Sequence, residues 1–206
     1  MLPPATLTQP SAVETVPLSG RALEVAEGDA DTIDSGARIW DAGRALSSFM
    51  ADQIPLADTR LLELGSGTGI VGLTAAASGA EVLLSDKPEL MPLLRLNIEA
   101  NGLLAGARAV PLLWGCEASA RELRAQPFDI ICGSDILYSP EQMPELLETI
   151  MHASTPGVTE VLLAYPRRYT EEIFLHAAEE HFHVLDEEEI EPAIFLSRLR
   201  RREPEE

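Results

Sequence analysis

Short apolar runs alternate with amphipathic stretches over most of this chain. The runs are almost continuously apolar, which is typical of strands buried on both faces of a parallel sheet. We expect strands at 60–64, 81–85, 108–113, 128–133 and 160–165, with two more near the C-terminus at 182–185 and 194–196. Apolar residues at helical spacing predict helices at 39–50, 89–101, 141–152 and 170–181. This order of elements predicts an α/β fold built on a doubly wound, mostly parallel sheet.

The two ends of the chain depart from this pattern. Residues 1–33 are weakly periodic and contain prolines and acids, with one short strand candidate at 22–26. We therefore assign residues 1–33 to a partly mobile N-terminal extension and residues 34–206 to one globular domain. Near the other end, the acidic run at 186–189 is expected to form a solvated turn.

The most informative segment is residues 61–72, with the sequence LLELGSGTGIVG. An apolar strand ends at a glycine-rich turn, and a helix of small and aliphatic residues follows. Glycines let a backbone approach a ligand closely, and a helix N-terminus presents free N–H groups to it. The next strand ends at Asp86, where a carboxylate can accept both hydroxyls of a ribose. The segment therefore predicts a site for a nucleoside-containing cofactor at the carboxyl ends of the strands.

The glycines fit two cofactor patterns. Residues 67–72 match the dinucleotide fingerprint G-x-G-x-x-G, whereas residues 63–69 match E-x-G-x-G-x-G, the pattern of S-adenosylmethionine-dependent methyltransferases. Glu63 directly before the loop disfavours a pyrophosphate and suits a zwitterionic ligand with an ammonium group and a sulfonium. The only lysine is Lys87, so the chain lacks the Tyr-x-x-x-Lys of short-chain dehydrogenases and the Gly-Lys-Ser/Thr of a P-loop. We expect S-adenosyl-L-methionine as the cofactor and no metal.

A second group of polar residues follows the fourth expected strand. Ser134 stands at its end, and Asp135 and Tyr138 come directly afterwards. Trp114 follows the third strand, where an indole can cover the face of an adenine. Because the carboxyl ends of parallel strands meet at one edge of a sheet, we expect these side chains beside the glycine loop.

In these segments the chain resembles the family-16 methyltransferases, seven-strand enzymes that methylate lysines of chaperones, elongation factors and calmodulin-like proteins. The resemblance runs from about residue 36 to about residue 168, and it is closest to the cytosolic subgroup with heat-shock-chaperone and AAA-ATPase substrates. It rests on Trp40-Asp41, the 63–69 loop, Ser85-Asp86, Leu113-Trp114-Gly115 and a D-x-x-Y motif at 135–138. It implies a Rossmann-like seven-strand sheet with an antiparallel last strand, and methyl transfer from S-adenosyl-L-methionine to a lysine of a protein.

The resemblance also implies residue roles. Asp135 and Tyr138 would face the substrate lysine as the catalytic residues. The cofactor-binding residues would be Trp40, Glu63, Gly65, Ser66, Gly67, Asp86, Trp114 and Ser134. Among these, Glu63 would support the methionine-ammonium end of the site. Ser66 and Ser134 depart from the family, in which alanine is common at both positions.

Two other functions stay open. A methyltransferase acting on histidine or on a small molecule would use the same chemistry, and a non-catalytic module would bind the cofactor to regulate a partner. The intact D-x-x-Y motif argues against a non-catalytic module, which would have little need for Asp135. The lack of an inserted cap between strands argues against a small-molecule enzyme, which usually encloses its substrate.

Composition limits the partners and the compartment. The formal net charge of -19 argues against nucleic acid as the main partner, because binding phosphates needs a basic surface. No stretch is long and apolar enough to span a membrane, and no secretory signal is recognisable. Two cysteines at no metal spacing favour a reducing compartment, so we expect a cytoplasmic location, with the nucleus or an organelle left open. We expect a monomer whose protein substrate is a chaperone or an ATPase.

Overall fold

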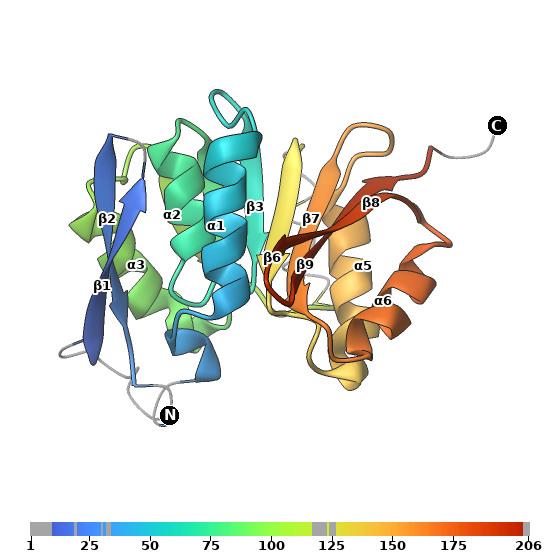
Figure 1. Cartoon of the computed structure of the whole chain (residues 1–206), viewed down its shortest axis with the longest axis horizontal. Coiled ribbons are helices and arrows are strands. Elements are labelled where there is room, and N and C mark those ends of the chain that lie inside the picture. Colours follow the sequence, from blue (N-terminus) through green and yellow to red (C-terminus); the bar gives the residue numbers. More distant parts are fainter. Residues whose placement is uncertain are drawn as a thin grey trace.

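The computed structural model describes residues 10–18, 20–29, 31, 34–116, 123 and 127–203. Within these residues, seven strands form one large sheet and two form a separate hairpin (Figure 1). The large sheet contains β3 (Arg60–Leu64), β4 (Glu81–Asp86), β5 (Ala107–Pro111), β6 (Ile130–Ser134), β7 (Glu160–Pro166), β8 (Phe182–Glu191) and β9 (Ile194–Arg201). The hairpin contains β1 (Ala12–Leu18) and β2 (Arg21–Glu27). The helices are α1 (Asp41–Gln53), α2 (Ile70–Ala77), α3 (Met91–Ala100), α5 (Met143–Ala153) and α6 (Thr170–Ala178), and short 3₁₀ turns cover η1 (Ser35–Ala37), η2 (Pro88–Leu90) and η3 (Pro140–Gln142).

The large sheet has the strand order β5-β4-β3-β6-β7-β9-β8. Strands β3 to β7 pair with one another in parallel, and β9 is antiparallel to both β7 and β8. The expected seven-strand sheet, mostly parallel with an antiparallel last strand, is therefore confirmed. The chain runs outward from β3 to β5 and then returns to place β6 beside β3. That switch point, between β3 and β6, is where open α/β sheets bind their ligands.

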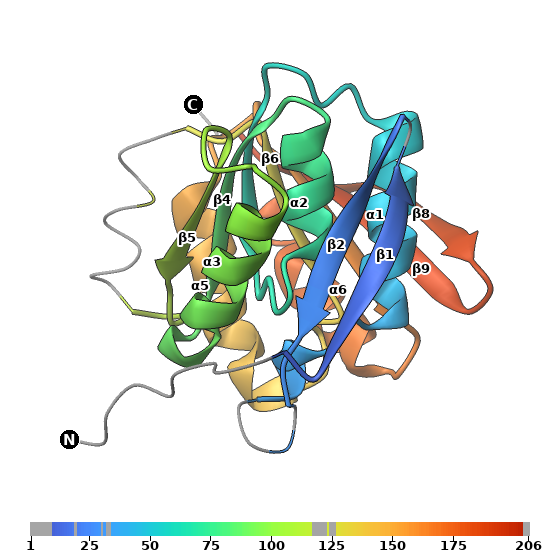
Figure 2. The ribbon, with the colours of Figure 1, turned by 90° about the vertical axis from the view of Figure 1, so that its left-hand side faces the viewer.

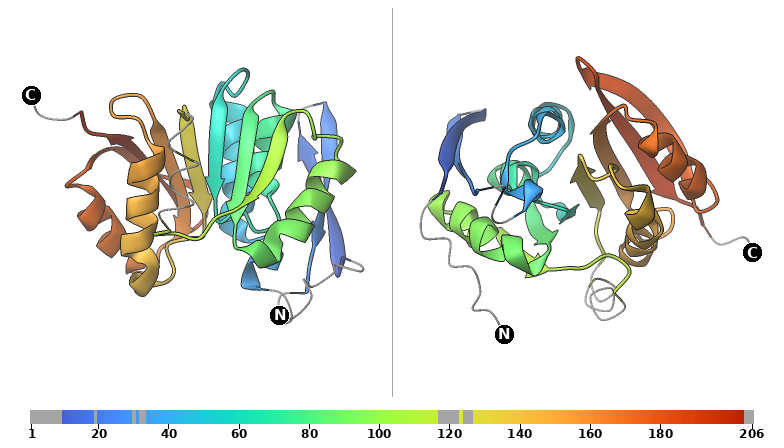
Figure 3. Two further views of the ribbon diagram at one scale, coloured as in Figure 1. Left: turned by 180° about the vertical axis from the view of Figure 1, so that it is seen from behind. Right: turned by 90° about the horizontal axis from the view of Figure 1, so that it is seen from below.

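Helices cover both faces of the sheet, as the view from below in Figure 3 shows. The side chains of β3 point alternately to the two faces of the sheet. Leu61 belongs to the core on the side of the hairpin and α1 to α3, whereas Leu62 and Leu64 belong to the core on the side of α5 and α6. This period of two divides the core into two large apolar clusters, one on each face. No helix in the described part of the chain is long and apolar enough to cross a membrane.

The hairpin β1–β2 lies against α3 (Figure 2). The side chain of Asn97 is fully buried there, and its Oδ1 accepts a hydrogen bond from Ala26 N at 2.8 Å. Its Nδ2 donates to Ala26 O at 2.9 Å and to Thr68 O in the glycine loop at 2.8 Å. The sequence predicted β2 but no strand at 12–18, because β1 is largely exposed and carries no apolar run.

The acidic run at 186–189 is a second difference from the sequence prediction. These residues belong to strand β8, which pairs with β9 at the edge of the sheet, and they do not form a turn. Their side chains are mostly exposed, so this strand does not need apolar residues and can contain acidic ones. Charged side chains also protect an edge strand from pairing with other chains.

Candidate active site

A cavity of about 580 Å³ lies at the carboxyl ends of β3, β4 and β6. Its size is in the range of small-molecule and cofactor sites. The predicted residues that line it are Trp40, Gly65, Ser66, Gly67, Asp86, Trp114, Ser134, Asp135 and Tyr138. The structure therefore brings together every predicted site residue except Glu63, from segments separated by up to about a hundred positions in the chain.

The glycine loop has a backbone that only glycine adopts easily. Gly65 and Gly67 have φ values of 61° and 56°, in the left-handed region. A Cβ on Gly65 would come within 2.7 Å of Ile136 Cγ2, and one on Gly67 within 2.5 Å of Gly36 O. The glycine loop therefore packs closely against the D-x-x-Y loop on one side and against the η1 segment on the other.

Hydrogen bonds to β4 hold the glycine loop in place. Ser66 N donates to Ser85 O at 3.0 Å, and Ser85 N donates to Ser66 Oγ at 3.0 Å. Gly67 N donates to Asp86 Oδ2 at 2.7 Å. The Ser66 hydroxyl thus anchors the loop, which gives a structural reason for a serine where the resemblance implies alanine.

Glu63 lies behind the glycine loop, which differs from its predicted contact with the cofactor. Its side chain is 1% exposed and does not line the cavity. Its Oε2 accepts a hydrogen bond from Gly72 N at 3.0 Å, at the start of α2. Burial raises the pKa of Glu63 to about 8, against the lowering effect of that hydrogen bond. Glu63 supports the strand–loop–helix junction and does not present a carboxylate to the cavity.

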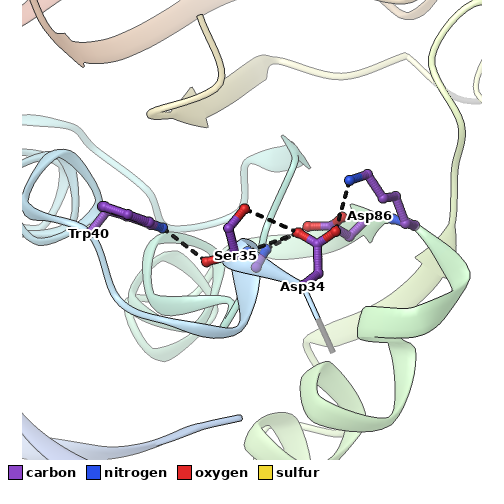
Figure 4. A network of polar contacts seen from close by, with 7 residues as sticks. Asp34, Ser35, Trp40 and Asp86 are labelled. Atoms are coloured by element: carbon purple, nitrogen blue, oxygen red, sulfur yellow. Dashed lines mark hydrogen bonds and ion pairs between the residues drawn. The ribbon is translucent and has the colours of Figure 1, made fainter. Parts of the chain in front are cut away.

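Asp86 stands at the cavity wall within a polar network that includes the η1 segment (Figure 4). Its Oδ1 accepts from Lys87 N at 2.7 Å, in addition to the bond from Gly67 N. Burial raises the pKa of Asp86, while these two hydrogen bonds lower it. Lys87 Nζ pairs with Asp34 Oδ2 at 2.9 Å, which connects the end of β4 to the segment before α1. Each Asp86 oxygen keeps a further lone pair that can accept a hydroxyl.

Two indoles border the cavity. Trp40 directly precedes α1, is 47% exposed, and donates from Nε1 to Ser35 O at 3.2 Å (Figure 4). Its exposure excludes a role in the core. Trp114 is partly buried against the cluster on the α5 side, and its Cζ2 would lie 3.6 Å from a Cβ on Gly65. Both rings can therefore offer apolar area to a ligand that enters beside the glycine loop.

The D-x-x-Y motif lines the same cavity beside the glycine loop. Asp135 directly follows β6, with a φ of 55° that is uncommon for a residue other than glycine. Its backbone N donates to Ala164 O at 2.8 Å, and its carboxylate forms a two-point ion pair with Arg168. Tyr138 is 48% exposed at the cavity wall, so a protein segment outside the cavity can reach it.

Sequence reasoning missed six charged residues that line the cavity, and three of them, Asp34, Lys87 and Arg168, form ion pairs there. The positions of two of these three could have been recognised from the sequence. Lys87 directly follows β4, and Arg168 comes two residues after the end of β7. Both therefore lie at the edge of the sheet that holds the other site residues. Their partners, however, are 53 and 33 positions away in the sequence, so no local pattern reveals the ion pairs.

Comparisons with known proteins agree with this geometry. The model of a family described as lysine methyltransferase matches residues 18–183. Protein N-lysine methyltransferase METTL21A of Xenopus tropicalis is 33% identical over 171 residues, covering 80% of this chain and 78% of that protein. EEF1A lysine methyltransferase 3 of Mus musculus is 30% identical over 189 residues, covering 89% and 80% respectively. A solved structure of a putative SAM-dependent methyltransferase from Streptococcus mutans has the same fold, with a TM-score of 0.67 at 14% identity over 91% of this chain and 55% of that one.

Proposed function

This chain belongs to the lysine methyltransferase family, and from that premise we propose that its cavity binds S-adenosyl-L-methionine next to a lysine side chain of a protein substrate. The chain is a protein-lysine N-methyltransferase, because the family it belongs to and the two relatives from Xenopus tropicalis and Mus musculus are lysine methyltransferases. The observation that supports the residue roles is that Asp86 and Asp135 line one cavity with the glycine loop.

The residues of the cavity fit the proposed cofactor. Gly65 and Gly67 line the cavity without side chains, so the backbone of the glycine loop can face a ligand at close range. Asp86 would accept the ribose hydroxyls, and the indoles of Trp40 and Trp114 would cover apolar parts of the adenosine. When bound, S-adenosyl-L-methionine supplies a methyl group on a sulfonium, which is reactive enough that the protein mainly has to position the acceptor.

Asp135 and Tyr138 would act on the lysine. A lysine ammonium has no lone pair, so it must lose a proton to solvent before the amine can attack, and burial at the cavity favours the neutral amine. The Asp135 carboxylate would accept hydrogen bonds from the amine and thereby direct its lone pair. The Tyr138 ring would form part of the wall beside the lysine stem, and its hydroxyl would offer a second polar contact.

We propose a chaperone or an ATPase as the protein substrate, with the elongation factor in the name of the mouse relative as a further candidate. We also propose that the substrate protein is basic around its target lysine, because a chain with a net charge of -19 attracts positively charged partners. We also propose that the chain acts as a monomer in the cytoplasm. Light scattering of the purified chain and imaging of a tagged copy test these two proposals.

The activity is tested with tritium-labelled S-adenosyl-L-methionine and a lysate whose own methyltransferases have been inactivated by heat. Mass spectrometry then locates the methyl group in the labelled protein. Methyl-lysine supports the proposal, whereas methyl-histidine or a labelled small molecule supports one of the alternatives. If no label is transferred although S-adenosylhomocysteine binds, the result supports the non-catalytic cofactor-binding module.

A further inference from the structure

The loops that follow β6 and β7 are joined by the side chain of Arg168. Its Nη1 and Nη2 contact Asp135 Oδ1 and Oδ2, the second pair at 3.2 Å. Arg168 lines the cavity together with Asp135, and its side chain is 38% exposed. Such a two-point contact between guanidinium and carboxylate fixes the orientation of both planar groups.

The backbone on both sides of this ion pair is held firmly. Asp135 N donates to Ala164 O of β7, and the Thr170 hydroxyl donates to Leu137 O. Arg168 N donates to Glu171 Oε2 at 2.9 Å, and Glu171 is 2% exposed. The guanidinium therefore approaches Asp135 from a fixed loop, and it leaves the Asp135 side chain little freedom to rotate.

The ion pair leaves Asp135 able to accept more hydrogen bonds. A carboxylate has about four lone-pair sites, and Arg168 uses one on each oxygen. The remaining sites can accept N–H groups of a substrate amine. The pairing also raises the pKa of Arg168, so the ion pair favours a guanidinium that is charged in any case.

We propose that Arg168 is a positioning residue for methyl transfer, which holds the Asp135 carboxylate in the orientation that accepts the lysine amine. This inference rests on the proposed role of Asp135 and adds a second residue that acts through it. It differs from a purely structural role, in which Arg168 would only connect two loops and its loss would affect the whole fold equally.

The test uses Arg168→Met, which keeps most of the side-chain length but removes the guanidinium. Arg167→Met is the matched control, because Arg167 is the neighbouring residue, is similarly exposed and pairs with Glu187 away from the cavity. Initial rates are measured as tritium transferred to the main labelled band of the heat-treated lysate. Calorimetry with S-adenosylhomocysteine measures cofactor binding, and thermal unfolding confirms that each variant is folded.

We expect Arg168→Met to lower the initial rate by about tenfold to a hundredfold, the scale for a misplaced reacting group. Affinity for S-adenosylhomocysteine should stay within about twofold, and Arg167→Met should match the parent chain in both assays. Arg168→Lys should restore only part of the rate, because an ammonium cannot make the two-point contact.

A double-mutant cycle identifies the residue through which Arg168 acts. Asp135→Asn is the second substitution, since asparagine tolerates the left-handed backbone at this position. If Arg168 acts through Asp135, adding Arg168→Met to Asp135→Asn should lower the rate no further. If the double variant is slower than Asp135→Asn by the same factor by which Arg168→Met slows the parent chain, the inference is overturned. The same holds if Arg168→Met is faster than the parent chain or has the same rate as Arg167→Met. An unchanged rate in Asp135→Asn alone would instead contradict the proposed role of Asp135.

Discussion

Replacing Glu63 by glutamine should change the pH dependence of stability. Glu63 is almost fully buried, and burial raises its pKa to about 8, whereas the ordinary value is 4.5. Between these two pH values, the folded state holds a proton that the unfolded state has released. The stability that this group contributes is therefore complete below about pH 4.5 and is lost as the pH rises towards about 8.

The size of the effect follows from the width of this window. One pKa unit corresponds to about 1.4 kcal/mol, so three pH units would change the free energy of unfolding by about 4 kcal/mol. Because Glu63 is half ionised in the folded state at pH 8, we expect a fall of about 3–4 kcal/mol between pH 5 and pH 8 through Glu63 alone. In Glu63→Gln the amide is neutral at both pH values, and its oxygen can still accept the hydrogen bond from Gly72 N. The variant should lose this part of the pH dependence and should be more stable than the parent chain at pH 8.

Urea unfolding of both proteins at pH 5 and at pH 8 measures the effect. The difference in free energy of unfolding between variant and parent should shift in favour of the variant by about 3–4 kcal/mol from the lower to the higher pH. Taking the difference removes the contributions of other groups, including Asp86, whose pKa is also raised. The reasoning is refuted if the difference is the same at both pH values while the slopes with urea agree.

Three further substitutions test the site. Asp86→Ala removes the proposed acceptor for the ribose hydroxyls and should cost about 1.5–3 kcal/mol of S-adenosylhomocysteine binding by calorimetry, with unchanged affinity as the contradicting result. Gly67→Ala should abolish that binding in a folded protein, because its Cβ would meet Gly36 O at 2.5 Å, whereas Gly102→Ala, with a similar φ and open space around it, should bind normally. Asp135→Asn should slow methylation about a hundredfold while S-adenosylhomocysteine affinity changes little, and loss of both together would assign Asp135 to cofactor binding.

The buried half of the fold could be predicted closely from the sequence. Strand β3 has the predicted bounds, and β4 is one residue longer than predicted, because both are apolar runs that end at a polar or glycine residue. The exposed strands gave no such signal. Strand β1 and the acidic half of β8 lie at sheet edges, and their side chains are mostly exposed. They form strands because they pair with β2 and β9, and no apolar pattern marks them in the sequence.

The site was predictable where it depends on position along a strand. Asp86, Trp114, Ser134 and Asp135 line the cavity because each lies at or beyond the carboxyl end of a strand. Glu63 was assigned to the cofactor from its place before the glycines, but alternation along β3 sets it on the same face as Leu61, opposite to Leu62 and Leu64. Because side chains alternate along any strand, Glu63 shares the face of Leu61, which packs with α2, and it is buried there.

The hairpin and the glycine loop share an anchor in Asn97. Its amide satisfies both backbone groups of Ala26 in β2 and the carbonyl of Thr68 in the loop, inside a region from which water is excluded. A displaced hairpin would leave that amide with unpaired donors and acceptors, which is costly in a buried position. The segment before α1 makes a second connection, through the ion pair between Asp34 and Lys87 beside Asp86. The residues ahead of the large sheet therefore help to hold the cofactor loop, although none of them belongs to the glycine motif.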